Sequence, residues 1–560
     1  MATMTAQIDT LDQPEKTGMF APLRERPFRR IWSASVLTNF AQLFLGVGAA
    51  WEMTRLSPSP GMVALVQTAM MLPLVVVSLP AGAVADMYDK RMVAIFGLVL
   101  SSIFALILAA IAFLGLLSPW VLLAFCSLIG TGVALYGPSW QSSIPEQVSL
   151  KNLPAAIGLG TVSFNVARSF GPALGGVIVL AAGAKAVFGL TAILYAPLLI
   201  AFIMWDRQHV PSRLPPERVD RAIVGGARYA FHSLPIRTSF ARVFLFCLSS
   251  ASATALAPLV AKDLLGGDAA TYGLMLGATG VGAVSGALYV SKIRDCFSTE
   301  MTVRMLALGA GFPLIVIAMS TSLLVTSAAY FVLGLSNILT IALLNVNVQL
   351  SAPRWVAARA LSLYGSSLTL GFALGAWGWG AFAGNVGLVN AYYVSGAATL
   401  LTALLGYIFP LSRDEEGEKD TVKIGSDPNV ALGLNLRSGP IVVEVDFDVD
   451  PDDAREFYAV MIRMQRMRKR IGGFEWSISR DIENPALWTE RYHCPTWGDY
   501  LRMRDRYTQM DFDVQAEAQA FDRTPGELRV RRRLGRPYGS VRWKAESPDA
   551  RQETIDYIGP

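Results

Sequence analysis

Residues 93–116 read VAIFGLVLSSIFALILAAIAFLGL and contain no Asp, Glu, Lys or Arg. About 20 apolar residues in a helix cross the hydrocarbon core of a bilayer, whereas a helix on the surface of a soluble protein keeps a polar face. Uncharged runs of this kind recur at 62–84, 187–205 and 389–409. The sequence therefore predicts an all-α polytopic membrane protein.

The composition changes after Ser412, where the density of charged residues becomes that of a soluble domain. Over the whole chain only 16% of residues are charged, against roughly 25% in ordinary soluble proteins. The four Cys are far apart and form no CxxC, and three His are too few for a metal cluster. We attribute the formal net charge of +5 to membrane topology. We expect no metal, no cofactor and no nucleic-acid partner.

The loops between the apolar runs predict the topology. We place twelve spans, which brings both termini to one side, at 31–55, 62–84, 92–116, 119–140, 154–182, 186–205, 239–261, 270–291, 301–321, 323–349, 357–383 and 388–410. The odd-numbered loops hold only Arg55, Lys185 and Lys262 as basic residues, whereas Lys and Arg crowd the even-numbered loops. Because basic loops stay cytoplasmic, we expect a multi-pass protein of the inner (plasma) membrane with both termini in the cytoplasm.

The longest internal loop divides the spans into two sets of six. Residues 171–175, GPALG, match residues 371–375, GFALG, which indicates an internal repeat. Such repeats are typical of transporters that bind their substrate between the halves. The predicted domains are an N-terminal cytoplasmic segment (1–30), two six-helix halves (31–205 and 239–410), the cytoplasmic loop between them (206–238), a linker (411–438), and a cytoplasmic ferredoxin-like domain with its tail (439–560).

The loop after span two carries a recognisable motif. Residues 82–91 read GAVADMYDKR and resemble the major facilitator superfamily signature G-x-L-A-D-x-x-G-R-K/R. Asp89 replaces the second Gly, as in the branch called transmembrane secretion effectors, which contains enterobactin exporters and macrolide-efflux-like proteins. The resemblance covers residues 20–410. It implies a conformational latch built from Gly82, Asp86, Lys90 and Arg91.

Span five carries a second motif. Its small residues resemble the antiporter pattern gX8GX3GPX2GG, with Ala167 in place of the middle Gly, at Gly158, Gly171, Pro172, Gly175 and Gly176. That pattern marks exporters more often than importers. The resemblance therefore implies export by antiport.

Arg168 lies about halfway along span five, where a charge is costly unless it faces a cavity or a partner. We expect it to attract an anion or to gate a central cavity; the alternative is a structural Arg that binds helix carbonyls at the Gly171-Pro172 bend. In the superfamily, spans one, four, seven and ten line the cavity. The candidate substrate-binding residues are Asn39, Gln42, Asn165, Arg168, Asn345 and Gln349. Hydrogen bonding between helices is the alternative for Asn39, Gln42 and Asn345.

Glu52 is the one carboxylate within span one. Proton antiporters that resemble this chain couple through a carboxylate whose pKa burial raises. Glu52 is therefore the candidate proton-coupling residue, and the alternative is a surface position beside Arg55.

The chain after Pro410 predicts a β-α-β-β-α-β order, which is ferredoxin-like. Strands are expected at 441–449, 474–482, 486–494 and 527–534, and helices at about 451–470 and 497–522. The stretch resembles the dimeric α/β-barrel domains of the antibiotic-biosynthesis-monooxygenase group, which implies a homodimer through this domain. Four residues near the end of the third strand could form a ligand pocket or a dimer contact: Glu490, Tyr492, His493 and Trp497. The alternative is a structural role, because the single His has no second motif nearby.

These features predict a secondary transporter, not an enzyme, that exports a siderophore, drug or metabolite by alternating access with proton antiport. No Walker A sequence is present, so we do not expect direct drive by ATP. The alternative is a membrane-anchored enzyme or sensor whose C-terminal domain binds or processes the ligand. The expected partners are the small-molecule substrate and the lipid bilayer.

Overall fold

The computed structural model describes residues 20–87, 89–206, 228–296, 298–411, 428, 430–524 and 529–535. Contacts divide these residues into two compact units. The first unit comprises the described residues of 1–216, 240–344 and 364–410, and the second those of 217–239, 345–363 and 411–560. The division falls within α7, α12 and α13, so these three helices contribute residues to both units.

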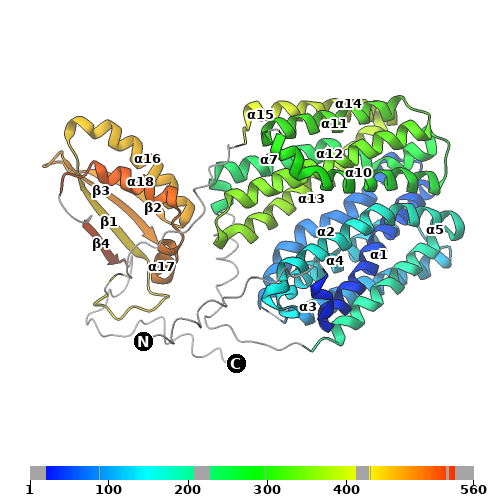
Figure 1. Cartoon of the computed structure of the whole chain (residues 1–560), viewed down its shortest axis with the longest axis horizontal. Coiled ribbons are helices and arrows are strands. Elements are labelled where there is room, and N and C mark those ends of the chain that lie inside the picture. The colour runs from blue at the N-terminus through cyan, green and yellow to red at the C-terminus, as the bar shows by residue number, and fades with distance from the viewer. Residues whose placement is uncertain are drawn as a thin grey trace, which may run out of the picture. The chain divides into compact units, whose positions relative to one another are not determined.

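The first half of the chain is built from long apolar helices (Figure 1). A short 3-10 turn, η1 (Ala21–Arg24), leads into them, and η2 (Leu150–Asn152) precedes the longest. The helices are α1 (Arg26–Leu56), α2 (Pro60–Met87), α3 (Lys90–Phe113), α4 (Pro119–Gln147) and α5 (Leu153–Ile203). Within α5 the backbone leaves the helical region at Gly183, whose φ is 77°, at the point where predicted spans five and six meet.

The second half of the chain has the same character. Its helices are α7 (Leu234–Ser250), α8 (Ser252–Ala255), α9 (Ala257–Leu259), the π-helix η3 (Val260–Leu264), α10 (Ala269–Cys296), α11 (Thr299–Met319), α12 (Leu323–Ser351), α13 (Arg354–Val386), α14 (Leu388–Leu401), η4 (Thr402–Leu404) and α15 (Leu405–Ile408). Ser298 begins α11 by accepting a hydrogen bond from the backbone of Met301, which satisfies a free N–H of the first turn.

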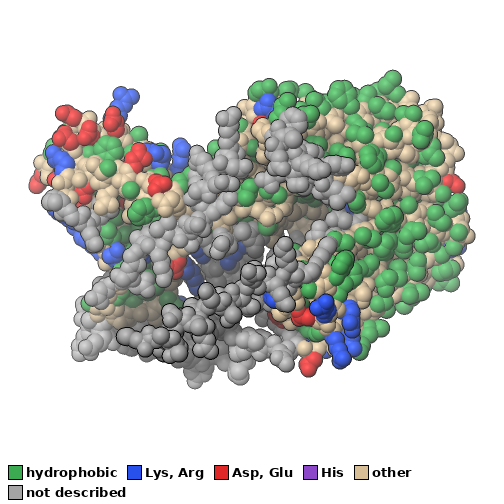
Figure 2. All heavy atoms as spheres, in the orientation of Figure 1, with side chains coloured by type: hydrophobic (Ala, Val, Ile, Leu, Met, Phe, Trp, Pro, Cys, Tyr) green, Lys and Arg blue, Asp and Glu red, His purple; other side chains and the backbone are tan. Residues whose placement is uncertain are grey.

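Nine helices among the described residues are long and apolar enough to cross a membrane. One of the nine contains the kink at Gly183, and the count does not include α10 or α13, which cover predicted spans eight and eleven. Twelve spans therefore stay a prediction. Hydrophobic side chains are spread over the visible face of the helical unit, among few charged ones (Figure 2). Exposed residues such as Phe96 and Trp120 suit contact with lipid rather than water. The chain is a multi-pass membrane protein.

The sheet in the second unit has four strands in the order β2-β3-β1-β4. The strands are β1 (Ile441–Asp448), β2 (Phe474–Arg480), β3 (Leu487–Cys494) and β4 (Arg529–Leu534), and β1 is antiparallel to both β3 and β4. Helix α16 (Ala454–Ile471) buries Phe457, Met461 and Met464 in the domain core. The predicted ferredoxin-like element order is confirmed.

The predicted helix at 497–522 is two helices, α17 (Trp497–Asp505) and α18 (Gln509–Ala520). Thr508 accepts from the backbone of Asp511, and the Asp511 carboxylate accepts from the backbone of Thr508. This reciprocal capping box begins a new helix and explains the break. The start of the first helix is as expected, because the Thr496 hydroxyl accepts from the backbone N–H of Asp499 at 3.1 Å.

Candidate functional site

The site begins with the position of Arg168 along α5. Arg168 is fifteen residues from the first residue of the helix, Leu153, and fifteen from the kink at Gly183. At 1.5 Å per residue each distance is about 22 Å. Arg168 therefore lies midway between the start of α5 and the kink at Gly183.

The side chain of Arg168 lies away from the lipid-facing surface of α5. That surface consists of exposed apolar residues at helical spacing, namely Val166, Phe170, Leu174 and Val177. Arg168 is half-buried, and its guanidinium is close enough to interact electrostatically with the fully buried Cys247 of α7. Since α7 belongs to the second half of the chain, Arg168 faces the seam between the halves.

Next to Arg168, α5 packs tightly against α10. The Ser169 hydroxyl donates to the carbonyl of Gly280 at 3.1 Å, and a Cβ at Gly280 would lie 2.3 Å from Cα of Ser169. Further along, a Cβ at Gly176 would lie 2.7 Å from Cα of Gly273. We call this contact the α5–α10 seam. Only small residues allow two helix backbones to approach so closely.

A matching contact joins α2 to α13. The Thr68 hydroxyl donates to the carbonyl of Ala373 at 2.9 Å, and a Cβ at Gly380 would lie 2.4 Å from Cβ of Ala64. We call this contact the α2–α13 seam. The two seams join the two halves of the chain through helices that correspond under the predicted repeat.

Two further contacts join the halves near the starts of α2 and α10. The distribution of basic residues in the loops predicts that this end of the helices faces the outside of the cell. The rings of Trp51 and Tyr272 stack with centroids 6.3 Å apart. The Lys262 ammonium donates to the carbonyl of Thr54 at 2.7 Å. At this end the halves are therefore held together by ring stacking, a charged hydrogen bond and backbone contact.

At the opposite end, described polar contacts tie helices of the same half. Lys90 donates to the carbonyl of Ser142 at 3.1 Å and lies 3.4 Å from a carboxylate oxygen of Glu146. Arg91 donates to the carbonyls of Phe202 and Ile203 at 3.0 and 2.6 Å. In the second half, Arg242 of α7 pairs with Glu300 of α11 at 2.5 Å, and its side chain is only 2% exposed.

Two predicted cavity residues of α1 bond to neighbouring helices of the first half. Asn39 donates to the hydroxyl of Ser163 on α5 at 2.9 Å, and Gln42 donates to the hydroxyl of Tyr136 on α4. Both side chains therefore make the interhelical bonds that were the alternative to cavity lining. Asn165 has no described side-chain position.

The other predicted site residues are placed as follows. Asn345 and Gln349 of α12 belong to the second unit and bond to each other at 2.5 Å. Glu52 lies near the end of α1 and pairs with Arg55, three residues later, at 3.4 Å. The helix α2 includes Gly82 and Asp86, but the surroundings of Gly82 and the side chain of Asp86 lie outside the described part of the structure.

The antiporter-type residues of α5 contribute mainly close packing. A Cβ at Gly171 would lie 3.0 Å from Leu43 of α1, one at Gly175 would lie 3.2 Å from Phe44, and Gly176 belongs to the α5–α10 seam. Pro172 lies inside the helix, and its carbonyl would be 2.9 Å from a Cβ at Gly273. Gly158 has open space around it.

The four residues singled out in the C-terminal domain do not form one pocket. Glu490 is fully buried and accepts two hydrogen bonds from Arg468, at 2.9 and 3.1 Å, and one from the Trp476 indole at 2.9 Å. Tyr492 lies on the same face of β3, with its ring 4.6 Å from the Arg468 guanidinium carbon. His493 points to the other face of the strand and packs on the ring of Phe474. Trp497 stacks on Tyr500.

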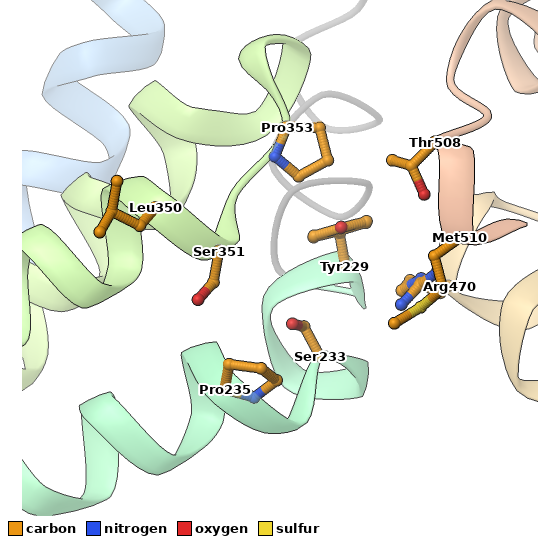
Figure 3. Close-up of a pocket in the computed structure, with 9 residues that line it drawn as sticks. All are labelled: Tyr229, Ser233, Pro235, Leu350, Ser351, Pro353, Arg470, Thr508 and Met510. Atoms are coloured by element: carbon orange, nitrogen blue, oxygen red, sulfur yellow. The ribbon is translucent and has the colours of Figure 1, made fainter. Parts of the chain in front are cut away.

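A depression in the second unit collects side chains from four stretches of the chain (Figure 3). Its lining residues are Tyr229, Ser233, Pro235, Leu350, Ser351, Pro353, Arg470, Thr508 and Met510. Arg470 lies over the Tyr229 ring at 5.7 Å and pairs with the Asp511 carboxylate. Arg228 donates to the carbonyl of Gly472 at 3.4 Å. These contacts connect the C-terminal domain to the residues that precede α7. In the described part of the chain, no group of three metal-ligating side chains could hold a metal ion.

A family profile and several known proteins match this chain. The sequence profile described as transmembrane secretion effector matches residues 17–538, a range that includes the C-terminal sheet. The chain is 24% identical over 259 residues to the staphyloferrin A transporter of Staphylococcus aureus, an alignment that covers 45% of this chain and 64% of the relative. It is 23% identical to the uncharacterized MFS-type transporter YfiS of Bacillus subtilis over 63% of this chain and 86% of that protein.

Solved structures show the same fold. A bacterial homolog of the human lysosomal transporter Spinster, in an inward-facing and unoccupied conformation, superposes with a TM-score of 0.55 at 14% identity over 69% of this chain and 95% of that one. The nucleoside transporter NupG superposes with a TM-score of 0.53 at 12% identity, over 69% of this chain and 99% of that one. At these identities the likeness concerns the fold of the helical part.

Proposed function

This chain belongs to the transmembrane secretion effector family, and we propose that it is a secondary transporter that exports a small organic molecule by alternating access. The proposal places the protein in the inner membrane with twelve spans and both termini in the cytoplasm. The substrate class comprises siderophores, drugs and metabolites. The S. aureus relative, which is named for staphyloferrin A transport, supports a siderophore-like cargo.

The observation that carries the proposal is the pair of matched seams. Both the α5–α10 seam and the α2–α13 seam join the halves by backbone contact between small residues. Rigid halves that meet at two such seams can rock about a site between them, which is the motion that alternating access requires. Arg168 lies beside one seam at mid-depth, and this position favours it as a substrate contact.

Proton antiport supplies the driving force in this proposal, with Glu52 as the coupling carboxylate. Its side chain is 13% exposed and 3.4 Å from Arg55. Glu52 is the one carboxylate that predicted span one supplies for coupling. Glu52→Gln should therefore uncouple transport from the pH gradient, while Arg55→Gln should keep the coupling.

Transport into inside-out membrane vesicles tests the proposal, because export from a cell becomes uptake in this orientation. Uptake of a panel of siderophores, drugs and metabolites is measured with and without an imposed pH gradient, and vesicles that lack the protein serve as the control. We expect uptake of at least one compound to depend on the protein and on the gradient. Uptake that runs only in right-side-out vesicles would refute export.

A second candidate function concerns the C-terminal domain. The contacts of Arg470 with Tyr229 and of Arg228 with Gly472 favour a sensor that acts on α7 rather than a separate enzyme, and a homodimer could form through this domain. Arg470→Ala should change the transport rate with an unchanged substrate affinity if the domain regulates. Arg463→Ala is the matched control, because Arg463 lies on the same helix and pairs with Glu517 at the surface. Equal rates in both variants would contradict a regulatory role.

A further inference from the structure

The charges of the helical unit are distributed unevenly along its helices. Glu52, Lys90, Glu146 and Glu300 lie near helix ends, Arg242 lies within α7, and each of the five has a described ion-pair partner. Arg168 is different, since it occupies the middle of its segment. Among the described residues, no carboxylate pairs with Arg168.

The surroundings of Arg168 do not neutralise it. Its electrostatic neighbour is Cys247, a fully buried thiol, and Cys247 in turn neighbours the buried Tyr364 of α13. The Tyr364 hydroxyl donates to the carbonyl of Ile341 at 2.7 Å, so its own hydrogen is already used. A cation among neutral groups at this depth has a large unfavourable free energy unless an anion approaches it.

The face of α5 that carries Arg168 also carries an apolar side chain. Phe164 lies one helical turn before Arg168, on the same face of α5, and is 47% exposed. Gly171 and Gly175, on the same face further along, contact Leu43 and Phe44 of α1. The exposed ring of Phe164 is therefore not on the lipid-facing surface of Val166 and Phe170. An aromatic ring one turn from a guanidinium suits a ligand that has both an apolar body and an anionic group.

We propose that the transported substrate is an organic anion, and that its carboxylate or equivalent oxyanion pairs with the Arg168 guanidinium at the seam while its apolar part lies against Phe164. The proposal rests on the proposed transport function and adds the substrate class. The planar guanidinium presents a fork of donors that matches a carboxylate. The same pairing would remove the unbalanced charge only when the substrate is present, so binding would be strongest for acids.

Equilibrium binding tests the proposal with the full chain in nanodiscs. The probes are benzoate, phthalate and 4-phenylbutyrate, each compared with its own methyl ester. We expect at least one acid to bind wild type tenfold or more tightly than its ester. Arg168→Gln should lose at least tenfold for that acid and leave the ester unchanged, while Arg168→Lys should retain part of the preference because it keeps the charge and loses the fork.

The matched control is Lys185→Gln, which removes an exposed cation at the turn after Gly183 and should leave binding of acids unchanged. Thermal unfolding of each variant confirms that it is folded, and the Lys variant keeps the test decisive if the Gln variant does not fold. Acids and esters that bind wild type equally, or an Arg168→Gln variant with unchanged affinity for acids, would overturn the anion site. Uptake of neutral esters alone in inside-out vesicles would also overturn it and leave the transporter proposal standing. If neither acids, esters nor the siderophore, drug and metabolite panel were taken up, the transport function itself would be contradicted.

Discussion

Replacing Gly280 by Ala should open the predicted outer end of the helical unit. The new Cβ would lie 2.3 Å from Cα of Ser169 and 2.8 Å from the carbonyl oxygen of Arg168. Both atoms belong to the backbone of α5, so no rotamer change relieves the clash and the two helices must separate. Overpacking of this kind costs about 1–3 kcal/mol. The cost applies only to the state in which the seam is closed.

A penalty of about 1–3 kcal/mol on one of two states changes their population ratio by about 5- to 150-fold. Spin labels at Arg55→Cys and Asp263→Cys report the separation, since both side chains are exposed and they adjoin the Thr54–Lys262 contact. The protein used for labelling also carries Cys296→Ser, so that this cysteine takes up no label. The three cysteines whose side chains are described are buried. Double electron–electron resonance measures the distance between the two labels. We expect a population with a longer distance in Gly280→Ala, and we expect that population to be rare in the protein without this substitution.

Gly158→Ala is the matched control, because that glycine lies in the same helix as Ser169 and a Cβ there would meet nothing within 4 Å. Its distance distribution should equal that of the parent. An unchanged distribution in Gly280→Ala, together with an unchanged transport rate, would refute the idea that the α5–α10 seam closes one state of a two-state cycle.

Three further predictions concern other parts of the molecule. Glu490→Gln leaves the buried Arg468 without its ion pair and should destabilise the C-terminal domain by about 3–5 kcal/mol. The control is Glu475→Gln, which changes a side chain that is 70% exposed and should have little effect on stability. The readout is the rate of maleimide labelling of Cys494. Burial raises the pKa of this thiol to about 12, so it stays protonated and unreactive at neutral pH until the domain opens. Equal labelling rates in both variants would contradict a stabilising role for the Arg468–Glu490 pair. Reporter fusions after Pro560 and in the loop at 264–270 should lie on opposite sides of the membrane, and identical readouts would exclude the twelve-span topology. Asp86→Asn should slow transport with little change in substrate affinity, and a wild-type rate would remove Asp86 from the latch.

The elements that could be predicted from the sequence are those fixed by local composition. The uncharged run at 93–116 corresponds to α3 (Lys90–Phe113), and the loop and span-five motifs indicated the transmembrane secretion effector family, which the profile match confirms. The enterobactin-exporter branch and the monooxygenase-like assignment of the C-terminal domain stay predictions.

The contacts between distant helices could not be predicted in the same way. Gly273 and Gly277 of α10 pack against α5, but nothing local to α10 specifies that its partner is α5. The roles of Trp51, Tyr272 and Lys262 have no sequence signal for the same reason. The break before Gln509 could have been found, because Thr508 and Asp511 have capping-box spacing. Tyr492 and His493, which are neighbours in the sequence, face opposite sides of the sheet because adjacent strand residues alternate between its faces.

The two seams also determine which conditions the protein should respond to. Contact between glycine and alanine backbones is stabilised by dispersion forces, which neither salt nor protons alter. The acyl chains of the bilayer press laterally on the same helices, and that pressure varies with the length and unsaturation of the lipids. We therefore expect the turnover of this protein to differ between membranes of different lipid composition even under an identical proton gradient. Reconstitution in short-chain and long-chain lipids would measure that difference directly.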